Sequence, residues 1–178
     1  MNVGNRPDLD SYFLDIAAVV AHRGTCVARR VGAVAVIDKH LVATGYNGVP
    51  LGAPHPTVCL RRQRGLPSGV ETFLCGCVHA EMNIIAQAAL HGARLKGATI
   101  YCTNQPCHLC AMLLINAGVA RVVYRETYPD EAAVRLFRQS GVCLEQRCGE
   151  IAGEEEPDGA GPHSPGPDSA GPDGAAPA

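Results

Sequence analysis

The chain has 178 residues, of which 47% are hydrophobic and 18% charged, and this length and composition favour a single packed domain. Its 15 basic and 17 acidic residues give a formal net charge of -2, which argues against a protein that wraps nucleic acid or coats a membrane surface. No apolar run approaches the roughly 20 residues of a membrane span, and the start of the chain lacks the apolar core of a signal peptide. We therefore expect a cytoplasmic protein.

In chain order, apolar residues recur at helical spacing over residues 9–23, where Asp8 or Asp10 is placed to cap the helix. Two Val- and Ala-rich segments, 31–37 and 41–45, flank a turn and predict a β-hairpin. Many Gly and Pro residues without a sustained period predict a long loop over 46–74, and long loops inside compact domains are often functional. Further along, the pattern predicts helices at 78–91, 106–117 and 130–140 and strands at 98–102, 120–124 and 142–146.

Strands that alternate with helices are typical of an α/β fold with a parallel portion. The opening hairpin makes the predicted five-stranded sheet mixed. The composition changes near residue 153, beyond which Gly, Pro and Ala dominate and large apolar side chains are missing. Such a segment cannot bury enough surface to offset its chain entropy. We therefore predict a folded domain over residues 1–152 and a disordered tail over 153–178.

Two short motifs bring together the residue types of a zinc site. His79-Ala80-Glu81 opens the predicted helix 78–91, and Pro106-Cys107-His108-Leu109-Cys110 opens the predicted helix 106–117. Residues 107 and 110 are three apart, so both sulfur atoms lie on one helical face, away from His108. One imidazole and two thiolates leave the fourth tetrahedral position for water, as in catalytic zinc sites. We predict His79, Cys107 and Cys110 as the zinc ligands.

Glu81 is predicted to carry protons rather than to bind the metal. Zinc lowers the pKa of a bound water to about 7, and a carboxylate two residues from His79 can take a proton from that water. It can then deliver protons to a ring nitrogen and to departing ammonia. This pair of motifs, with these roles, is the general signature of zinc deaminases of nucleobases. A lone C-x-x-C motif also occurs in redox and structural zinc sites, and a lone H-x-E motif is a weaker signal still, so the prediction depends on the two together.

The chain resembles the cytidine and deoxycytidylate deaminase superfamily, most of all the bacterial type of deoxycytidylate (dCMP) deaminase. The resemblance runs from about residue 8 to 146 and includes Arg29-Arg30-Val31-Gly32-Ala33, Thr44-Gly45-Tyr46-Asn47-Gly48-Val49-Pro50, His79-Ala80-Glu81-Met82-Asn83, Thr103-Asn104-Gln105-Pro106-Cys107-His108-Leu109-Cys110-Ala111 and Tyr128-Pro129-Asp130. It implies a three-layer α/β/α fold and the hydrolysis of dCMP to dUMP and ammonia for thymidylate synthesis. It also implies a homo-oligomer, commonly a hexamer, and dCTP and dTTP as effectors.

The same resemblance suggests which residues bind the substrate. Asn47 matches the position that hydrogen-bonds the sugar, although Asn47-Gly48 also suits a turn. Arg29 matches an arginine near the 5′-phosphate, where a guanidinium fork is suitable, although it could equally be an ordinary surface charge. The Ala80 backbone N–H is placed to hold the base carbonyl. Thr25 and Tyr124 are further candidates.

Four more cysteines lie in the N-terminal half of the chain. Some members of the resembled group carry a second, structural zinc, and Cys26, Cys59 and Cys75 match the positions of its cysteines. With Cys77, four thiolates would close a tetrahedron without an open position, as in structural zinc sites, and would fasten the loop 46–74. His55 competes with Cys77 as the fourth ligand, and four thiols that are merely buried are the alternative to a metal site.

Two other functions are compatible with a zinc site of this kind. A tRNA adenosine deaminase would use the same chemistry but would need a basic face, which the formal charge of -2 does not favour. A zinc-stabilised nucleic-acid-binding module for DNA uptake, without activity, would not need Glu81. The sequence therefore predicts a nucleotide deaminase, with zinc as its cofactor and no membrane partner.

Overall fold

We describe a computed structural model of the chain over residues 6–67 and 69–147. Its centre is one five-stranded sheet with the order β2-β1-β3-β4-β5. The strands are β1 (Gly32–Ile37), β2 (His40–Tyr46), β3 (Thr99–Asn104), β4 (Arg121–Glu126) and β5 (Cys143–Gln146). β1 pairs antiparallel with both β2 and β3, whereas β3, β4 and β5 run parallel. The predicted mixed sheet is confirmed.

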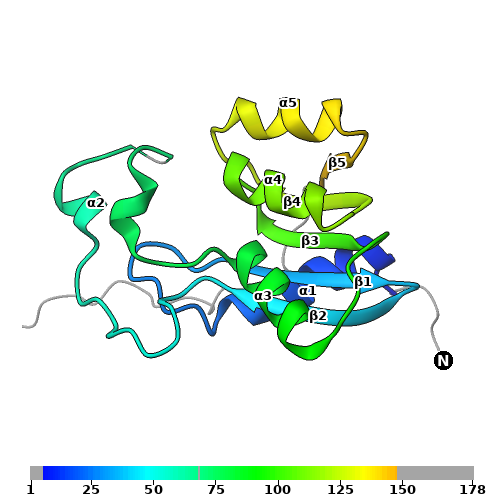
Figure 1. Cartoon of the computed structure of the whole chain (residues 1–178), viewed down its shortest axis with the longest axis horizontal. Coiled ribbons are helices and arrows are strands. Elements are labelled where there is room, and N and C mark those ends of the chain that lie inside the picture. The colour runs from blue at the N-terminus through cyan, green and yellow to red at the C-terminus, as the bar shows by residue number, and fades with distance from the viewer. Residues whose placement is uncertain (1–5, 68, 148–178) are drawn as a thin grey trace, which may run out of the picture.

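Helices cover both faces of the sheet, which gives the three predicted layers (Figure 1). The helix α1 (Leu9–Ala21) packs on one face, where its Phe13, Leu14 and Ala17 join side chains of β1, β3 and β4 in one apolar cluster. The helices α3 (Ala80–His91), α4 (His108–Asn116) and α5 (Glu131–Gln139) cover the other face and share the larger cluster with it. No helix of the described residues is long and apolar enough to cross a membrane.

Local sequence explains how several of these elements begin and end. Asp8 caps α1, because its carboxylate accepts hydrogen bonds from the backbone N–H groups of Asp10 and Ser11. At the hairpin between β1 and β2, Asp38 and Lys39 both have positive φ, as in a type I′ turn. The loop between β2 and α3 contains two short helices that the sequence did not indicate, α2 (Leu60–Gln63) and the 3₁₀ helix η2 (Thr72–Cys75).

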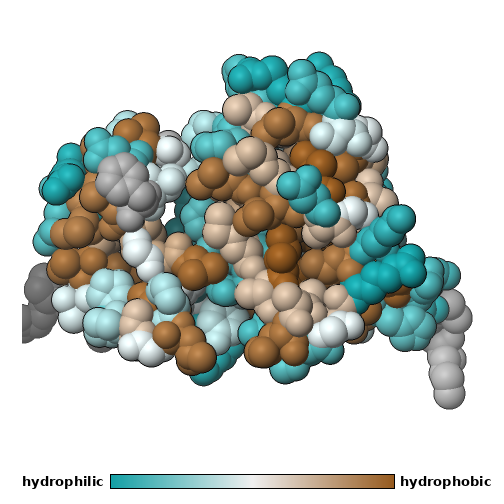
Figure 2. Space-filling view, in the orientation of Figure 1, coloured by the Kyte–Doolittle hydropathy of each residue, from teal (hydrophilic) through white to brown (hydrophobic). Residues whose placement is uncertain are grey.

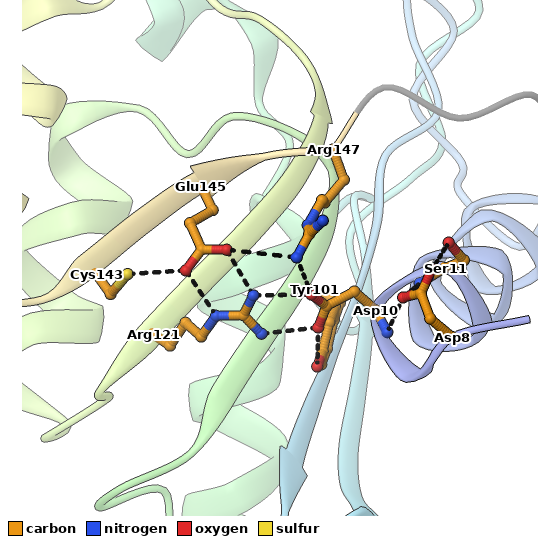
Figure 3. Close-up of polar contacts among 8 residues, drawn as sticks. All are labelled: Asp8, Asp10, Ser11, Tyr101, Arg121, Cys143, Glu145 and Arg147. Carbon is orange, nitrogen blue, oxygen red and sulfur yellow. Dashed lines mark hydrogen bonds and ion pairs between the residues drawn. The ribbon is translucent and has the colours of Figure 1, made fainter.

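A cluster of charged side chains ties α1 to the parallel half of the sheet (Figure 3). The guanidinium of Arg121 donates to both carboxylate oxygens of Asp10, at 2.7 and 2.8 Å, and to Glu145 on β5. Arg147 and the hydroxyl of Tyr101 also donate to Asp10. The Arg121 guanidinium lowers the pKa of both Asp10 and Glu145 to about 2. This cluster lies at the start of β4, at the end of the strand opposite to the zinc motifs.

The predicted tail, residues 153–178, lies outside the described residues, so its disorder and the domain boundary at residue 152 stay predictions.

Candidate zinc centre and substrate cavity

The structure brings His79, Cys107 and Cys110 together at the point where two helices begin. His79 is the N-terminal cap residue of α3 and Cys107 that of α4, while Cys110 lies in the first turn of α4. The Nδ1 atom of His79 is 3.4 Å from the sulfur of Cys107 and 3.4 Å from that of Cys110. Ligands of a tetrahedral zinc lie about 3.6 Å from one another, given bonds of about 2.1 to 2.3 Å. The three residues therefore fit zinc, with Nδ1 as the ligating nitrogen.

Electrostatics at these helix starts favour the thiolate that a metal needs. The adjacent Cys110 thiol and then the His79 ring lower the pKa of Cys107 to about 4. The Cys107 thiolate and burial raise the pKa of Cys110 in turn. Free backbone N–H groups at a helix N-terminus also stabilise such an anion. A divalent cation supplies the charge that lets both sulfurs ionise.

Glu81 lies in the first turn of α3 with its side chain buried, and it lines the same cavity as His79. Its carboxylate is not part of the cluster of three ligand atoms that lie within 4.8 Å of one another. Burial raises its pKa above the usual range for a glutamate. A buried carboxylate beside a metal cluster, with a raised pKa, is suited to take up and release a proton.

A cavity of about 250 Å³ opens beside the metal cluster. Three of the predicted substrate residues, Arg29, Asn47 and Ala80, line it. The Asn47 amide organises the cavity wall, because its Oδ1 accepts from the Val31 N–H at 2.9 Å and its Nδ2 donates to the Arg29 carbonyl at 2.8 Å. Within the described residues the second N–H of the Asn47 amide makes no hydrogen bond, so it is available to a ligand; the sugar contact stays a prediction.

Thr25 and Tyr124, the other two candidates, do not line this cavity. Thr25 braces the loop behind Asn47, where its backbone N–H donates to the Asn47 carbonyl at 3.0 Å. Tyr124 is 8% exposed and belongs to the apolar cluster on the α3 side of the sheet.

The cavity also holds polar residues that the sequence reasoning did not single out: Asn104, Gln105, Arg61, Arg62 and Tyr128. Asn104 and Gln105 directly precede Pro106-Cys107, and both are buried although they are polar. Their place beside a metal motif was a usable signal. The two arginines sit on α2, inside the long loop, so only the fold brings them to the cavity.

A second cysteine cluster lines the same cavity. The sulfur atoms of Cys26, Cys75 and Cys77 lie within 4.8 Å of one another, with Cys26 and Cys75 3.9 Å apart. A hydrogen bond with the Cys75 thiol lowers the pKa of Cys26 to about 5. Cys59 is the cap residue of α2 and lines the cavity, but it is not one of this group of three, and His55 is exposed.

Comparisons with known proteins agree with this site. Residues 7–126 match the family model for the cytidine and deoxycytidylate deaminase zinc-binding region. The chain is 42% identical over 125 residues to a deoxycytidylate deaminase of Mycobacterium phage D29, covering 67% of this chain and 96% of the phage protein. It is 37% identical over 144 residues to the deoxycytidylate deaminase of Schizosaccharomyces pombe, covering 79% of this chain but only 44% of that longer protein.

Solved structures give the same result. A dCMP deaminase from the cyanophage S-TIM5, crystallised with dCMP and dUMP, superposes with a TM-score of 0.68 at 27% identity, covering 80% of this chain and 98% of the phage chain. The matched family region contains both metal motifs and every residue that lines the cavity except Tyr128. The chain therefore belongs to the cytidine and deoxycytidylate deaminase family, whose zinc-binding region it contains.

Proposed function

We propose that the chain hydrolyses dCMP to dUMP and ammonia and so feeds thymidylate synthesis. The observation that carries this proposal is the convergence of His79, Cys107 and Cys110 beside the buried carboxylate of Glu81, at the floor of a cavity of nucleotide size. The names of its relatives and the dCMP and dUMP of the cyanophage structure support the same substrate.

His79, Cys107 and Cys110 would hold the zinc, which when bound lowers the pKa of a water molecule to about 7 and polarises it for attack. Glu81 takes a proton from that water and delivers it to N3 of the cytosine ring as the C4–O bond forms. It then passes the second proton of the water to the amino group, which leaves as ammonia while the C4–N bond breaks. The Ala80 N–H, one of the donors left free at the start of α3, orients the base through its carbonyl.

The phosphate of the substrate is recognised at the arginine-lined end of the cavity. Arg61 and Arg62 use their guanidinium groups to hold the loop, donating to carbonyls of Val70, Pro67 and Ala28. Arg29 is exposed, and within the described part of the chain its side chain has no hydrogen bond or ion pair. It lines the cavity with a free guanidinium. We therefore assign the 5′-phosphate to Arg29.

Steady-state kinetics test this assignment. We expect Arg29→Gln to lower kcat/KM for dCMP by about 10- to 100-fold, because a charge-assisted hydrogen bond contributes about 1.5 to 3 kcal/mol. The kcat/KM for deoxycytidine, which has no phosphate, should change little in this variant. Arg94→Gln, which removes an exposed arginine outside the cavity, is the matched control. Equal losses on both substrates would show that Arg29 does not bind phosphate.

Cys26, Cys75 and Cys77 support a second, structural zinc, and Cys59, which lines the same cavity, is our proposed fourth ligand. Cys59 affects the titration of Cys77, so the two are close enough to interact. A metal at this point would join the segment between α1 and β1 to α2 and η2. It would thereby hold the lobe that α2 and η2 form beside the sheet (Figure 1).

Metal analysis should find two zinc ions per chain. We expect Cys75→Ser to reduce this to one and to lower the melting temperature by at least about 5 °C, because a structural zinc contributes directly to folding. Cys59→Ser should act in the same direction. Cys143→Ser, at an exposed cysteine outside both clusters, should change neither quantity. One zinc per wild-type chain would exclude the structural site.

The two alternative functions are less well supported. A tRNA adenosine deaminase would need a basic RNA-binding face, and the formal charge of the chain is -2. A binding module for DNA uptake has no use for a buried glutamate beside a metal cluster. Ammonia release measured with dCMP and with a tRNA anticodon stem-loop distinguishes a dCMP deaminase from a tRNA adenosine deaminase. DNA binding at several salt concentrations tests the DNA-uptake module.

We also propose that the chain forms a homo-oligomer, with a hexamer as the expected size. Apolar side chains gather on the outer face of α4 and beside α3 (Figure 2), where Leu90, Leu109, Met112 and Leu113 are 40% to 74% exposed. Adjacent exposed residues of this kind mark association surfaces. Sedimentation velocity measures the size of the oligomer.

We propose dCTP and dTTP as effectors of the activity, to be tested in assays at subsaturating dCMP. We also propose a cytoplasmic location, because reduced thiols at two metal sites fit a reducing compartment.

A further inference from the structure

A second cavity, of about 380 Å³, lies on the α1 side of the sheet. Side chains alternate across a strand, and Tyr101 and Val123 point to the α1 face, so Thr103 and Arg125 point there too. The cavity thus sits at the same end of β3 and β4 as the zinc motifs but behind the sheet. Arg29 and Asn104 line both cavities and form the wall between them.

Positive charge prevails around this second cavity. Arg29, Arg30 and Arg125 line it together with His22, against a single acid, Glu126. The Glu126 carboxylate is already engaged, because it accepts a hydrogen bond from the Asn104 amide at 2.7 Å. Within residues 6–67 and 69–147, the guanidinium groups of Arg29 and Arg30 have no hydrogen bond or ion pair. Asp15, which pairs with Arg125, and Glu126, which keeps its charge beside the neutral Asn104 amide, offset two of these positive charges. The Arg30 guanidinium has no acidic partner among the described residues.

Arg125 is the fixed part of the site. Its side chain is 12% exposed, and its Nη2 donates to the Asp15 carboxylate on α1 at 2.5 Å. Its Nε and Nη1 are buried without a hydrogen-bond partner among the described residues. A buried donor without a partner costs about 1 to 3 kcal/mol, and more when it is charged. Asp15 therefore holds in place a guanidinium that still has donors to satisfy.

We propose that this cavity binds the phosphate group of a ligand other than the substrate. A phosphate carries up to two negative charges and offers oxygens in several directions, which suits guanidinium groups that arrive from a loop and from β4. Arg125 forms the base of the site, and the exposed Arg30 side chain has the freedom to close over the anion. Inorganic phosphate and the phosphate of a nucleotide share this chemistry.

Isothermal titration of the zinc-loaded full chain with inorganic phosphate, in phosphate-free buffer, tests the proposal. We expect binding that persists when dUMP saturates the catalytic cavity. Arg30→Gln should weaken it at least about tenfold while leaving kcat/KM for dCMP unchanged, and Arg94→Gln should change neither. Arg125→Lys, which keeps the charge and the pairing with Asp15 but removes donors, should also weaken binding, with the melting temperature confirming its fold.

Three results would overturn the proposal. The first is no binding of phosphate to the wild type up to about 10 mM, and the second is equal phosphate affinity of the Arg30→Gln and Arg94→Gln variants. The third is displacement of phosphate by dUMP together with a raised KM for dCMP in Arg30→Gln. The last would make the cavity part of the substrate site. Titration with dAMP, also under saturating dUMP, identifies the source of the ligand. Tighter binding of dAMP than of phosphate indicates a nucleotide, and equal binding indicates the free anion.

Discussion

We expect Glu81→Gln to reduce kcat for dCMP by at least the 10²- to 10⁴-fold that general acid–base catalysis contributes, while the zinc content stays at the wild-type value. The amide has the size of the carboxylate, so the buried pocket at the start of α3 stays filled. It cannot take a proton from water at neutral pH. The zinc ligands His79, Cys107 and Cys110 are unchanged, so the metal should remain.

Turnover measured from ammonia release, with metal content determined on the same samples, decides this prediction. Glu131→Gln, at an exposed glutamate in the first turn of α5, is the matched control and should retain full activity. A Glu81→Gln variant with near-normal turnover would contradict the proposed mechanism. A variant that has lost its zinc would show instead that Glu81 holds the metal site together.

The second large effect is expected at Gly45, where β2 and α3 meet. A Cβ atom on Gly45 would lie 2.1 Å from the carbonyl oxygen of Ala80 and 2.8 Å from the backbone nitrogen of Ile84. Both contacts are with backbone, so no side-chain rotation relieves them. We expect Gly45→Ala to destabilise the fold by about 3 kcal/mol and to lower the melting temperature by about 6 °C or more. Activity should fall further, because Ala80 and Glu81 share the displaced helical turn.

Thr44→Ala is the control for this substitution. Thr44 is the neighbour of Gly45 on β2, and its side chain is exposed. Thr44→Ala should change the free energy of unfolding by no more than about 0.5 kcal/mol, as for most surface substitutions. Thermal unfolding followed by circular dichroism measures both variants. If Gly45→Ala melts within about 1 °C of the wild type, β2 and α3 do not pack as closely as described.

Much of the fold was predictable because hydrophobic periodicity and helix-start signals agree along the chain. The four predicted helices, α1, α3, α4 and α5, begin within two residues of their predicted positions. Their cap residues are Asp8, His79, Cys107 and Asp130. The hairpin and the three later strands are likewise confirmed. The short helices α2 and η2 were not predictable, because the loop that contains them has no apolar face of its own.

The candidate site was predictable to the extent that its residues lie in local motifs. His79, Glu81, Cys107 and Cys110 belong to two motifs whose spacing reflects chemistry. The arginines of the cavity walls have no such spacing. Arg125 looks like any polar residue at the end of a strand, and its burial against Asp15 depends on a contact 110 residues away in sequence. Long-range packing of this kind leaves no periodic signal.

The charged cluster around Asp10 has a consequence for how the chain folds as it is made. Asp10 leaves the ribosome early, whereas its partners Arg121 and Arg147 follow 111 and 137 residues later. At synthesis rates of about 5 to 20 residues per second, α1 waits roughly 6 to 27 seconds for them. For most of that time only the β1–β2 hairpin, among the strands that contact α1, can cover its apolar face, because β3 is made shortly before Arg121. Docking of α1 is thus completed last, when the parallel edge of the sheet arrives.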